Sequence, residues 1–259
     1  MLVIGAIDRG KSTYCHFLSR HLLAAGWRVA MVDADVGQKD LGPPATITSG
    51  YPDASGAKVQ PTALYFVGAV SPVGHLLPMV LGTRRLVETA QGAFVLINTT
   101  GLVHGVGRIL KGYKIEAVQP DVVVALEQGT ELQPITRAHR HYRTLHLQPS
   151  ASAMAKTAEQ RRQARERAFC SYFQAATEVV LPCRRLIFQR REVPTGFAPH
   201  LLCGVADRRN RGLGLAIITG LDWSQGMLSL LTPVPAESIQ VIQGGDLYLT
   251  PDGRELDRR

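Results

Sequence analysis

The chain opens on a glycine-rich stretch, Gly5-Ala6-Ile7-Asp8-Arg9-Gly10-Lys11-Ser12, that directly follows the apolar run Leu2–Ile4. It fits the pattern G-x-x-x-x-G-K-[ST], in which the glycines let the backbone curl so that successive N–H groups point into one concavity. The helical pattern that begins at Lys11 adds the positive end of a helix dipole at the same place. The stretch therefore predicts a phosphate-binding loop between a buried strand and a helix, and we expect a nucleoside triphosphate to bind there.

The residues of this loop have separate predicted roles. We expect Lys11 to reach the β- and γ-phosphates, and the Ser12 hydroxyl to hold a magnesium ion that bridges them. The remaining contacts to the nucleotide are expected from Gly5, Asp8, Arg9, Gly10 and Thr13.

Short apolar runs alternate with longer helical patterns along most of the chain, which is the order that builds parallel sheets. Strands are expected over residues 2–4, 29–32, 64–67, 94–97, 122–126 and 144–147, and helices over 11–25, 75–91, 107–115, 132–141 and 155–175. After about Val193 the runs 201–205, 213–218, 227–231 and 240–249 follow without helical patterns. We predict a P-loop NTPase of the α/β class, with a mostly parallel sheet flanked by helices over residues 1–192 and a small β-rich domain over 193–259.

Two aspartates follow the second expected strand, in the segment Asp33-Ala34-Asp35-Val36-Gly37-Gln38. Ligands of open parallel sheets collect beyond the carboxyl ends of the strands, so these carboxylates should face the phosphate-binding loop. Because side chains alternate along extended backbone, both can point to one side, and we expect Asp33 and Asp35 as magnesium ligands. One of them is also placed to accept a proton from an attacking hydroxyl. The alternative is that either residue only forms a turn.

Two further elements carry weaker signals. Thr99, Thr100 and Gly101 follow another apolar strand, where small residues would let a substrate approach the backbone; a purely structural turn is the alternative. Arg161 and Arg165 lie one helical turn apart in the expected helix 155–175, so they project from one face. Such a pair could close over a transferring phosphoryl group, although a solvated face of Arg and Glu is also compatible with the pattern.

Composition narrows the class of partner. The 259 residues carry a formal net charge of +8, which suits a phosphate-rich partner such as nucleic acid without requiring one. The four cysteines are far apart and form no C-x-x-C pair, so we expect no zinc site or disulfide framework and a cytoplasmic location. No apolar run approaches the length that spans a bilayer, and no membrane association is expected.

The combination of motifs resembles the polynucleotide 5′-hydroxyl kinase family. The resemblance rests on Gly5–Thr13, on Asp33–Gln38, and on three later elements, namely Gly42-Pro43-Pro44-Ala45-Thr46, Phe66-Val67-Gly68 with Ser71-Pro72, and Asn98-Thr99-Thr100-Gly101. This family includes the kinase subunit of the eukaryotic pre-mRNA cleavage machinery, the ribosomal-RNA processing kinase, and archaeal and bacterial relatives. The motifs occur in order over most of the chain, and the D-x-D-x-G-Q element is more specific than the phosphate-binding loop.

The resemblance implies transfer of the γ-phosphate of ATP to the 5′-hydroxyl of RNA or DNA, with magnesium as the metal and GTP as a possible substitute. It implies Lys11, Asp35, Arg161 and Arg165 as catalytic residues, and Gln38 and Thr100 on the side of the substrate. Single-stranded or end-exposed nucleic acid, and proteins of RNA processing, are the implied partners.

The chain departs from the family pattern in two places. The cleavage-complex kinases carry a tryptophan after the T-x-G element that stacks on the terminal base, whereas Leu102 stands here. Larger relatives also begin with an N-terminal β domain, and this chain begins almost at the phosphate-binding loop. Two rival functions stay open, an ATP-binding scaffold of an RNA-processing complex without turnover and a P-loop kinase or synthetase for a small metabolite.

Overall fold

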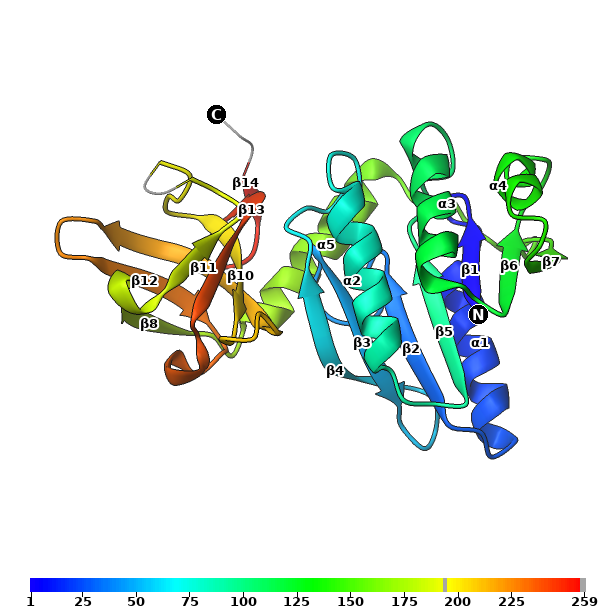
Figure 1. The fold of residues 1–259 in the computed structure, drawn as a ribbon, viewed down its shortest axis with the longest axis horizontal. Coiled ribbons are helices and arrows are strands. Elements are labelled where there is room, and N and C mark those ends of the chain that lie inside the picture. The colour runs from blue at the N-terminus through cyan, green and yellow to red at the C-terminus, as the bar shows by residue number, and fades with distance from the viewer. Residues whose placement is uncertain (193–194, 257–259) are drawn as a thin grey trace.

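The computed structural model describes residues 1–192 and 195–256. Within these residues, the N-terminal part contains parallel strands in the order β2-β5-β1-β6-β7 (Figure 1). Their bounds are β1 (Leu2–Gly5), β2 (Val29–Ala34), β5 (Phe94–Thr99), β6 (Val122–Leu126) and β7 (Arg143–Leu147). The sequences of β1 and β6 are almost wholly apolar because both faces of these central strands are buried. The expected α/β class with a mostly parallel sheet is confirmed in this part of the chain.

Helices pack on both faces of the parallel strands. α2 (Leu76–Thr89) and α3 (Val106–Val118) cover one face, α4 (Gln133–Ala138) lies beside α3, and α1 (Lys11–Ala24) covers the opposite face. Successive side chains of β1 point to opposite faces of the sheet. Leu2 and Ile4 pack toward α2 and α3, whereas Val3 packs toward α1. The loop that joins β1 to α1 therefore starts from a strand that is fixed on both sides.

An antiparallel pair extends the sheet beyond β2. β3 (Thr46–Pro52) pairs with β2, and β4 (Val59–Phe66) pairs with β3. The sequence predicts only one strand in this region, over residues 64–67. That prediction was wrong for residues 46–52, which also form a strand. The segment TITSGYP is polar and contains glycine and proline, which weaken the strand signal. Gly50 allows the backbones of β3 and β4 to approach each other closely, because a Cβ at this position would lie 2.2 Å from the carbonyl oxygen of Gln60.

The C-terminal part is built from short strands (left in Figure 1). They are β8 (Thr177–Pro182), β9 (Ile187–Gln189), β10 (Leu201–Ala206), β11 (Gly212–Asp222), β12 (Met227–Thr232), β13 (Val241–Leu249) and β14 (Glu255–Leu256). The four expected runs are β10 to β13, and they pair antiparallel. β8 pairs with β12 and β9 with β13, so residues 177–189 join this unit, although the sequence analysis places them in the domain 1–192. Val193 lies outside the described residues.

Helix α5 (Ala158–Phe173) connects the two parts and lies within the expected range 155–175. It begins with a capping box, in which the Thr157 hydroxyl accepts from the backbone N–H of Gln160 and the Gln160 side chain accepts from that of Thr157. At its other end, the fully buried Phe169 packs in a cluster with Phe66 of β4 and Leu202 of β10. The helix is therefore held by hydrophobic contact with both parts of the molecule.

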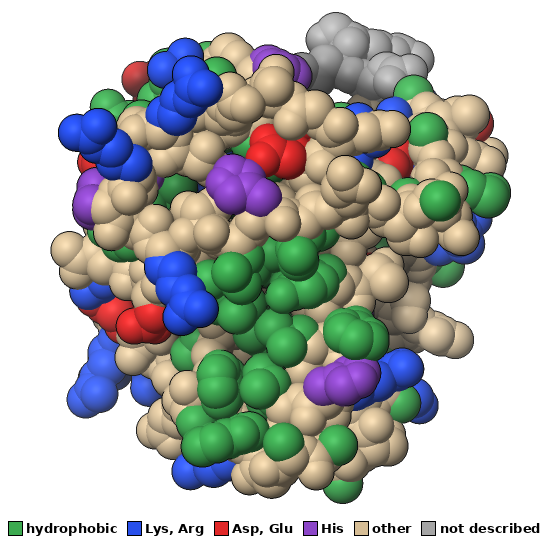
Figure 2. All heavy atoms as spheres, turned by 90° about the vertical axis from the view of Figure 1, so that its right-hand side faces the viewer, with side chains coloured by type: hydrophobic (Ala, Val, Ile, Leu, Met, Phe, Trp, Pro, Cys, Tyr) green, Lys and Arg blue, Asp and Glu red, His purple; other side chains and the backbone are tan. Residues whose placement is uncertain are grey.

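Strand β7 forms the outer edge of the parallel strands. Leu145 and Leu147 on this strand are each 36% exposed. Figure 2 shows this side of the molecule, where hydrophobic side chains gather in a central patch and Lys and Arg side chains lie around it. No helix among the described residues combines the length and the apolar character that a membrane span requires.

We expect Phe169→Ala to loosen the junction between the two parts. Removing a fully buried phenyl ring leaves a cavity, and the free energy of unfolding should fall by about 3–5 kcal/mol. Urea unfolding followed by circular dichroism measures the loss. Phe17→Ala on α1 is the matched control because Phe17 is 56% exposed, and a similar loss in both variants would contradict the assignment of Phe169 to the junction.

Candidate active site

The loop between β1 and α1 has the conformation that its sequence predicts. Gly10 adopts a φ of 80° at the start of α1, and Asp8 adopts a φ of 59°, so the backbone enters the left-handed region at both residues. A Cβ at Gly5 would lie 2.7 Å from the carbonyl oxygen of Leu126 on β6. The loop thus lies closely against β6. A residue with a side chain would clash with this strand at position 5 and would be strained at position 10.

Lys11 folds back over this loop. Its ammonium donates to the carbonyl oxygen of Ala6 at 2.8 Å, and the residue is only 7% exposed. Burial lowers the pKa of Lys11, an effect that the nearby carboxylates of Asp35 and Asp8 oppose. An anionic ligand in the loop would replace the Ala6 carbonyl as the acceptor and would favour the charged form of the amine.

Arg9 and Thr13, both expected to bind the nucleotide, differ in their surroundings. Thr13 is exposed. The guanidinium of Arg9 donates to Oε1 of Gln128 at 2.7 Å, and its Nε lies 3.8 Å from Oε1 of Glu131. Gln128 and Glu131 follow β6, and the sequence analysis did not single them out because no motif marks them. The contacts place the segment after β6 beside the phosphate-binding loop.

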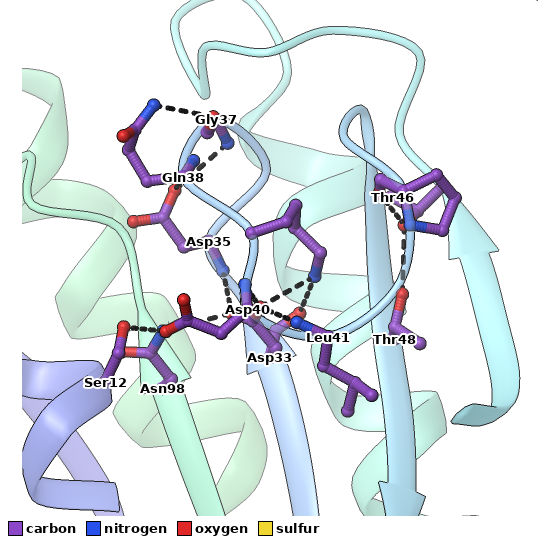
Figure 3. A network of polar contacts seen from close by, with 12 residues as sticks. Ser12, Asp33, Asp35, Gly37, Gln38, Asp40, Leu41, Thr46, Thr48 and Asn98 are labelled. Carbon is purple, nitrogen blue, oxygen red and sulfur yellow. Dashed lines mark hydrogen bonds and ion pairs between the residues drawn. The ribbon is translucent and has the colours of Figure 1, made fainter. Parts of the chain in front are cut away.

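Asp33, at the end of β2, is buried and fully engaged (Figure 3). Its Oδ1 accepts from the backbone N–H of Asp35 at 3.1 Å and from Nδ2 of Asn98 at 3.0 Å. Its Oδ2 accepts from the backbone N–H groups of Asp40 and Leu41 and lies 3.2 Å from the ammonium of Lys39. These contacts favour Asp33 as the organiser of the loop 35–41, while its expected role as a magnesium ligand stays a prediction.

Asp35 has a different environment. Its Oδ1 accepts from the backbone N–H groups of Gly37 and Gln38, both at 3.0 Å, and no hydrogen bond to its Oδ2 occurs among the described residues. Burial raises the pKa of Asp35, and the neighbouring charge of Asp33 raises it further. One carboxylate oxygen is therefore held in place while the other is available to a metal, a water molecule or a hydroxyl.

Asn98, at the end of β5, joins the phosphate-binding loop to the carboxylates. Its Nδ2 donates to the Ser12 hydroxyl at 3.2 Å as well as to Asp33, and its buried Oδ1 has no hydrogen-bond partner among the described residues. The Ser12 hydroxyl, Asp35 Oδ2 and Asn98 Oδ1 supply the oxygen ligands that magnesium prefers. The described residues contain no group of three or more His, Cys, Asp or Glu that could hold a metal unaided. These residues thus fit a magnesium ion that shares its ligands with a nucleotide.

Of the four residues expected on the side of the substrate, the three at the end of β5 and directly after it differ in their contacts. The Thr99 hydroxyl is buried and donates to the carbonyl oxygen of Val3 at 2.7 Å, so this side chain joins β5 to β1 and is not available to a substrate. Thr100 accepts from the ammonium of Lys111 through its carbonyl oxygen at 2.5 Å and its Oγ1 at 3.1 Å. A Cβ at Gly101 would lie 2.5 Å from Ile7, which brings this turn against the phosphate-binding loop.

We call α5 the lid helix, and Arg161 and Arg165 the lid arginines, after the role that the sequence predicts for them. The first of them, Arg161, reaches the phosphate-binding loop. Nη1 of Arg161 lies 3.2 Å from Oδ2 of Asp8 and donates to the carbonyl oxygen of Lys156 at 2.6 Å. The backbone N–H of Lys156 also donates to Asp8, at 2.9 Å. The Gln38 side chain donates to the Arg161 carbonyl oxygen at 3.4 Å. The start of α5 is thus fastened to the loop, where an Arg161 guanidinium can meet a phosphate.

The second lid arginine is engaged by the C-terminal part. Nε and Nη2 of Arg165 donate to the two carboxylate oxygens of Glu255 on β14, at 2.6 and 3.0 Å. Arg162 donates to the Glu255 carbonyl oxygen at 3.0 Å and to Glu166 at 3.1 Å. The sequence places Arg161 and Arg165 on one face of the helix, and the structure shows that they have different partners.

The comparisons with known proteins agree with this arrangement. Residues 5–175 match the family model described as mRNA cleavage and polyadenylation factor CLP1 P-loop. The chain belongs to this CLP1 P-loop family. A polyribonucleotide 5′-hydroxyl-kinase of Pyrococcus furiosus is 32% identical, in a match that covers 99% of this chain and 89% of that protein. One of Pyrococcus horikoshii is 30% identical, with 99% and 87% covered. The resemblance that the motifs indicate is confirmed.

Solved structures of Clp1p share the fold. The wild-type Clp1p–Pcf11p complex matches with a TM-score of 0.71 at 13% identity, over 95% of this chain and 74% of that one. A second structure, which describes the Pcf11p–Clp1p interface and ATP loss in a point mutant, matches with a TM-score of 0.70 over the same shares. At this identity the likeness concerns the fold alone, and it extends over both the CLP1 P-loop region and the C-terminal strands.

We expect Asp33→Asn to destabilise the protein through Lys39. The Lys39 and Asp33 side chains are only 1% and 5% exposed, so removing the carboxylate charge leaves a buried ammonium without its partner. Breaking a buried pair from one side typically costs about 3–5 kcal/mol of unfolding free energy. Adding Lys39→Met should recover part of that loss. Urea unfolding of the two single variants and the double variant measures the coupling, and strictly additive losses would argue against the pair.

We expect Glu255→Ala to free the lid helix from the C-terminal part. The Arg165 and Glu255 side chains are 17% and 16% exposed, so losing the bidentate pair should lower the free energy of unfolding by about 1–3 kcal/mol. Hydrogen exchange of the α5 amides should also become faster. The control is Glu88→Gln, which removes the more exposed pair with Arg84 and should cost at most about 0.5 kcal/mol. Unchanged exchange in α5 would refute the role of Glu255.

Proposed function

We propose that this chain is an ATP-dependent polynucleotide 5′-hydroxyl kinase, which transfers the γ-phosphate of ATP to the 5′-hydroxyl of RNA or DNA. The observation that carries the proposal is the meeting of three parts at one edge of the sheet. They are the phosphate-binding loop, the Asp35 carboxylate with one unengaged oxygen, and Arg161 from the lid helix. Membership of the CLP1 P-loop family, with kinases of this name among its relatives, supports it.

The phosphate-binding loop would hold the triphosphate. Lys11 would exchange the Ala6 carbonyl for the β- and γ-phosphates, and the backbone N–H groups of the loop would surround them. Ser12 and Asn98 would provide oxygen ligands for magnesium, which leaves the free oxygen of Asp35 to the acceptor hydroxyl. Bound magnesium-ATP supplies the transferable phosphoryl group together with a divalent charge that offsets the phosphates. GTP could fill the same loop, because the contacts to the phosphates do not depend on the base.

Asp35 would act as the general base. Its Oδ1 stays fixed by two backbone N–H groups, and its Oδ2 would accept the proton from the 5′-hydroxyl as the new bond from oxygen to phosphorus forms. The bond between the γ-phosphorus and the bridging oxygen breaks in line, and ADP leaves. The raised pKa of Asp35 makes its ionised form a stronger base than an exposed aspartate.

The lid arginines would offset charge on the transferring group. Arg161 already lies beside the phosphate-binding loop, where it would exchange Asp8 for the γ-phosphate. Arg165 would have to leave Glu255 to take part in the same way. Arg161 would therefore need only to exchange its partner at the loop, whereas Arg165 would also need a movement of its side chain.

The acceptor would lie over the turn after β5. Thr100 and Gly101 would face it in this turn, and Gln38, whose side chain donates to the Arg161 carbonyl oxygen, would approach it from the side of the lid helix. Leu102 stands at the place of the stacking tryptophan of the cleavage-complex kinases and cannot supply the roughly 1–3 kcal/mol of aromatic stacking on a base. Binding of the chain end would therefore depend more on phosphate contacts, and its affinity should fall steeply with salt. Proteins of RNA processing are the proposed macromolecular partners.

The decisive experiment incubates the protein with magnesium, γ-labelled ATP and short 5′-hydroxyl RNA and DNA oligonucleotides. We expect label at the 5′ end, and a loss of at least about 100-fold in rate for Lys11→Ala and for Asp35→Asn. Lys58→Ala, which changes an exposed lysine outside the site, should retain the wild-type rate.

Each alternative function gives its own result. ATP binding that requires Lys11 but gives no transfer or hydrolysis would favour an ATP-binding scaffold. Transfer to small hydroxyl compounds but not to oligonucleotides, with little dependence on salt, would favour a kinase or synthetase for a metabolite.

A further inference from the structure

Two lysines of helix α3 are fully buried beneath the candidate active site. Lys111 and Lys114 are both 0% exposed, and neither forms an ion pair with a carboxylate in the part of the chain that the structure describes. Neither belongs to a motif that the sequence analysis singled out. A buried ammonium without a carboxylate partner is costly, whereas a methionine would fill similar volume without that cost. Packing alone therefore does not account for these two residues.

Lys111 has specific contacts that point to its role. Its ammonium donates to both the carbonyl oxygen and the hydroxyl of Thr100, which is itself only 4% exposed. On the other side of this turn, Gly101 lies against Ile7 of the phosphate-binding loop so closely that a Cβ would come within 2.5 Å. The turn is thus held by Lys111 at Thr100, and at Gly101 by contact with the loop that is expected to bind the γ-phosphate.

Lys114 provides a contrast within the same helix. It lies one turn further along α3, and its ammonium is buried without any hydrogen-bond partner among the described residues. Burial lowers the pKa of Lys114 to about 7 and lowers that of Lys111 well below its ordinary value. The two residues share type, helix and burial, and they differ in the contact with Thr100.

We propose that Lys111 is a positioning residue for the acceptor, which acts by holding the Thr100–Gly101 turn where the 5′-hydroxyl of the nucleic acid meets the γ-phosphate. This inference rests on the proposed function. Lys111 does not touch the reacting atoms in this arrangement. Its effect passes through the Thr100 carbonyl and hydroxyl, which it fixes with two hydrogen bonds.

The test compares Lys111→Met with Lys114→Met in the full chain. In steady-state transfer from ATP to a 5′-hydroxyl oligonucleotide, Lys111→Met should raise the KM for the oligonucleotide about tenfold or more, since both hydrogen bonds that hold the turn are lost. Its KM for ATP should stay within about twofold of the wild type. Lys114→Met should leave both KM values within about twofold, because it removes no contact with the turn. Thermal unfolding of both variants verifies that they are folded.

Direct binding makes the outcome independent of turnover. Fluorescence anisotropy with a labelled 5′-hydroxyl oligonucleotide and a non-transferable ATP analogue should show the same selective loss for Lys111→Met. If the wild type transfers phosphate and Lys111→Met retains its KM for the oligonucleotide, or if Lys114→Met loses as much, the inference is overturned and the kinase function stands. If the wild type binds the oligonucleotide without transfer, the kinase function fails, and a selective loss of binding in Lys111→Met still supports the positioning role. If the wild type neither transfers nor binds, both fail.

Discussion

The buried carboxylate of Asp33 is the interaction on which the arrangement of the site depends. It accepts hydrogen bonds from the loop 35–41, from Asn98 on β5 and, through that residue, reaches Ser12 at the start of α1. Three segments that are distant in the sequence are thereby fixed at the carboxyl ends of adjacent strands. A carboxylate can accept several hydrogen bonds at once, whereas a neutral amide in its place would offer one oxygen and two donors. This explains why an acid stands at a position whose oxygen atoms are all engaged.

The charge balance of the site suits an anionic ligand. The side chains of Lys11 and Lys39 are buried beside two aspartates, and burial lowers the pKa of both amines. In the free protein, the cost of desolvation therefore disfavours the protonated, positively charged form of these amines. A triphosphate would favour the protonated amines and would gain from a positive field that is already in place.

The parts that the sequence predicted and the parts that it did not differ in physical origin. The phosphate-binding loop and the Asp35 segment were predictable because local backbone geometry requires glycines at fixed spacing and because side chains alternate along a strand. Asn98 and Lys111 were not singled out as site residues, since their roles arise from contacts between segments that meet only in the folded sheet. The direction of the Thr99 side chain could not be predicted for the same reason, because its hydroxyl donates to the neighbouring strand β1. β3 was missed because a polar strand with Gly50 is stabilised by its neighbours rather than by its own composition.

The lid helix couples the site to the C-terminal strands. Its first turn is fastened to Asp8, its middle to Glu255 and its end to the hydrophobic cluster around Phe169. Close packing at Gly253, where a Cβ would lie 2.6 Å from the backbone nitrogen of Cys170, leaves little room for the helix to slide along the C-terminal part. Local movement of the arginine side chains is therefore the easier route to an altered site, because it exchanges ion pairs without repacking the core. Under this constraint, a phosphate at the loop would compete with Asp8 for Arg161 and with Glu255 for Arg165, and the C-terminal strands would influence the site through that second competition.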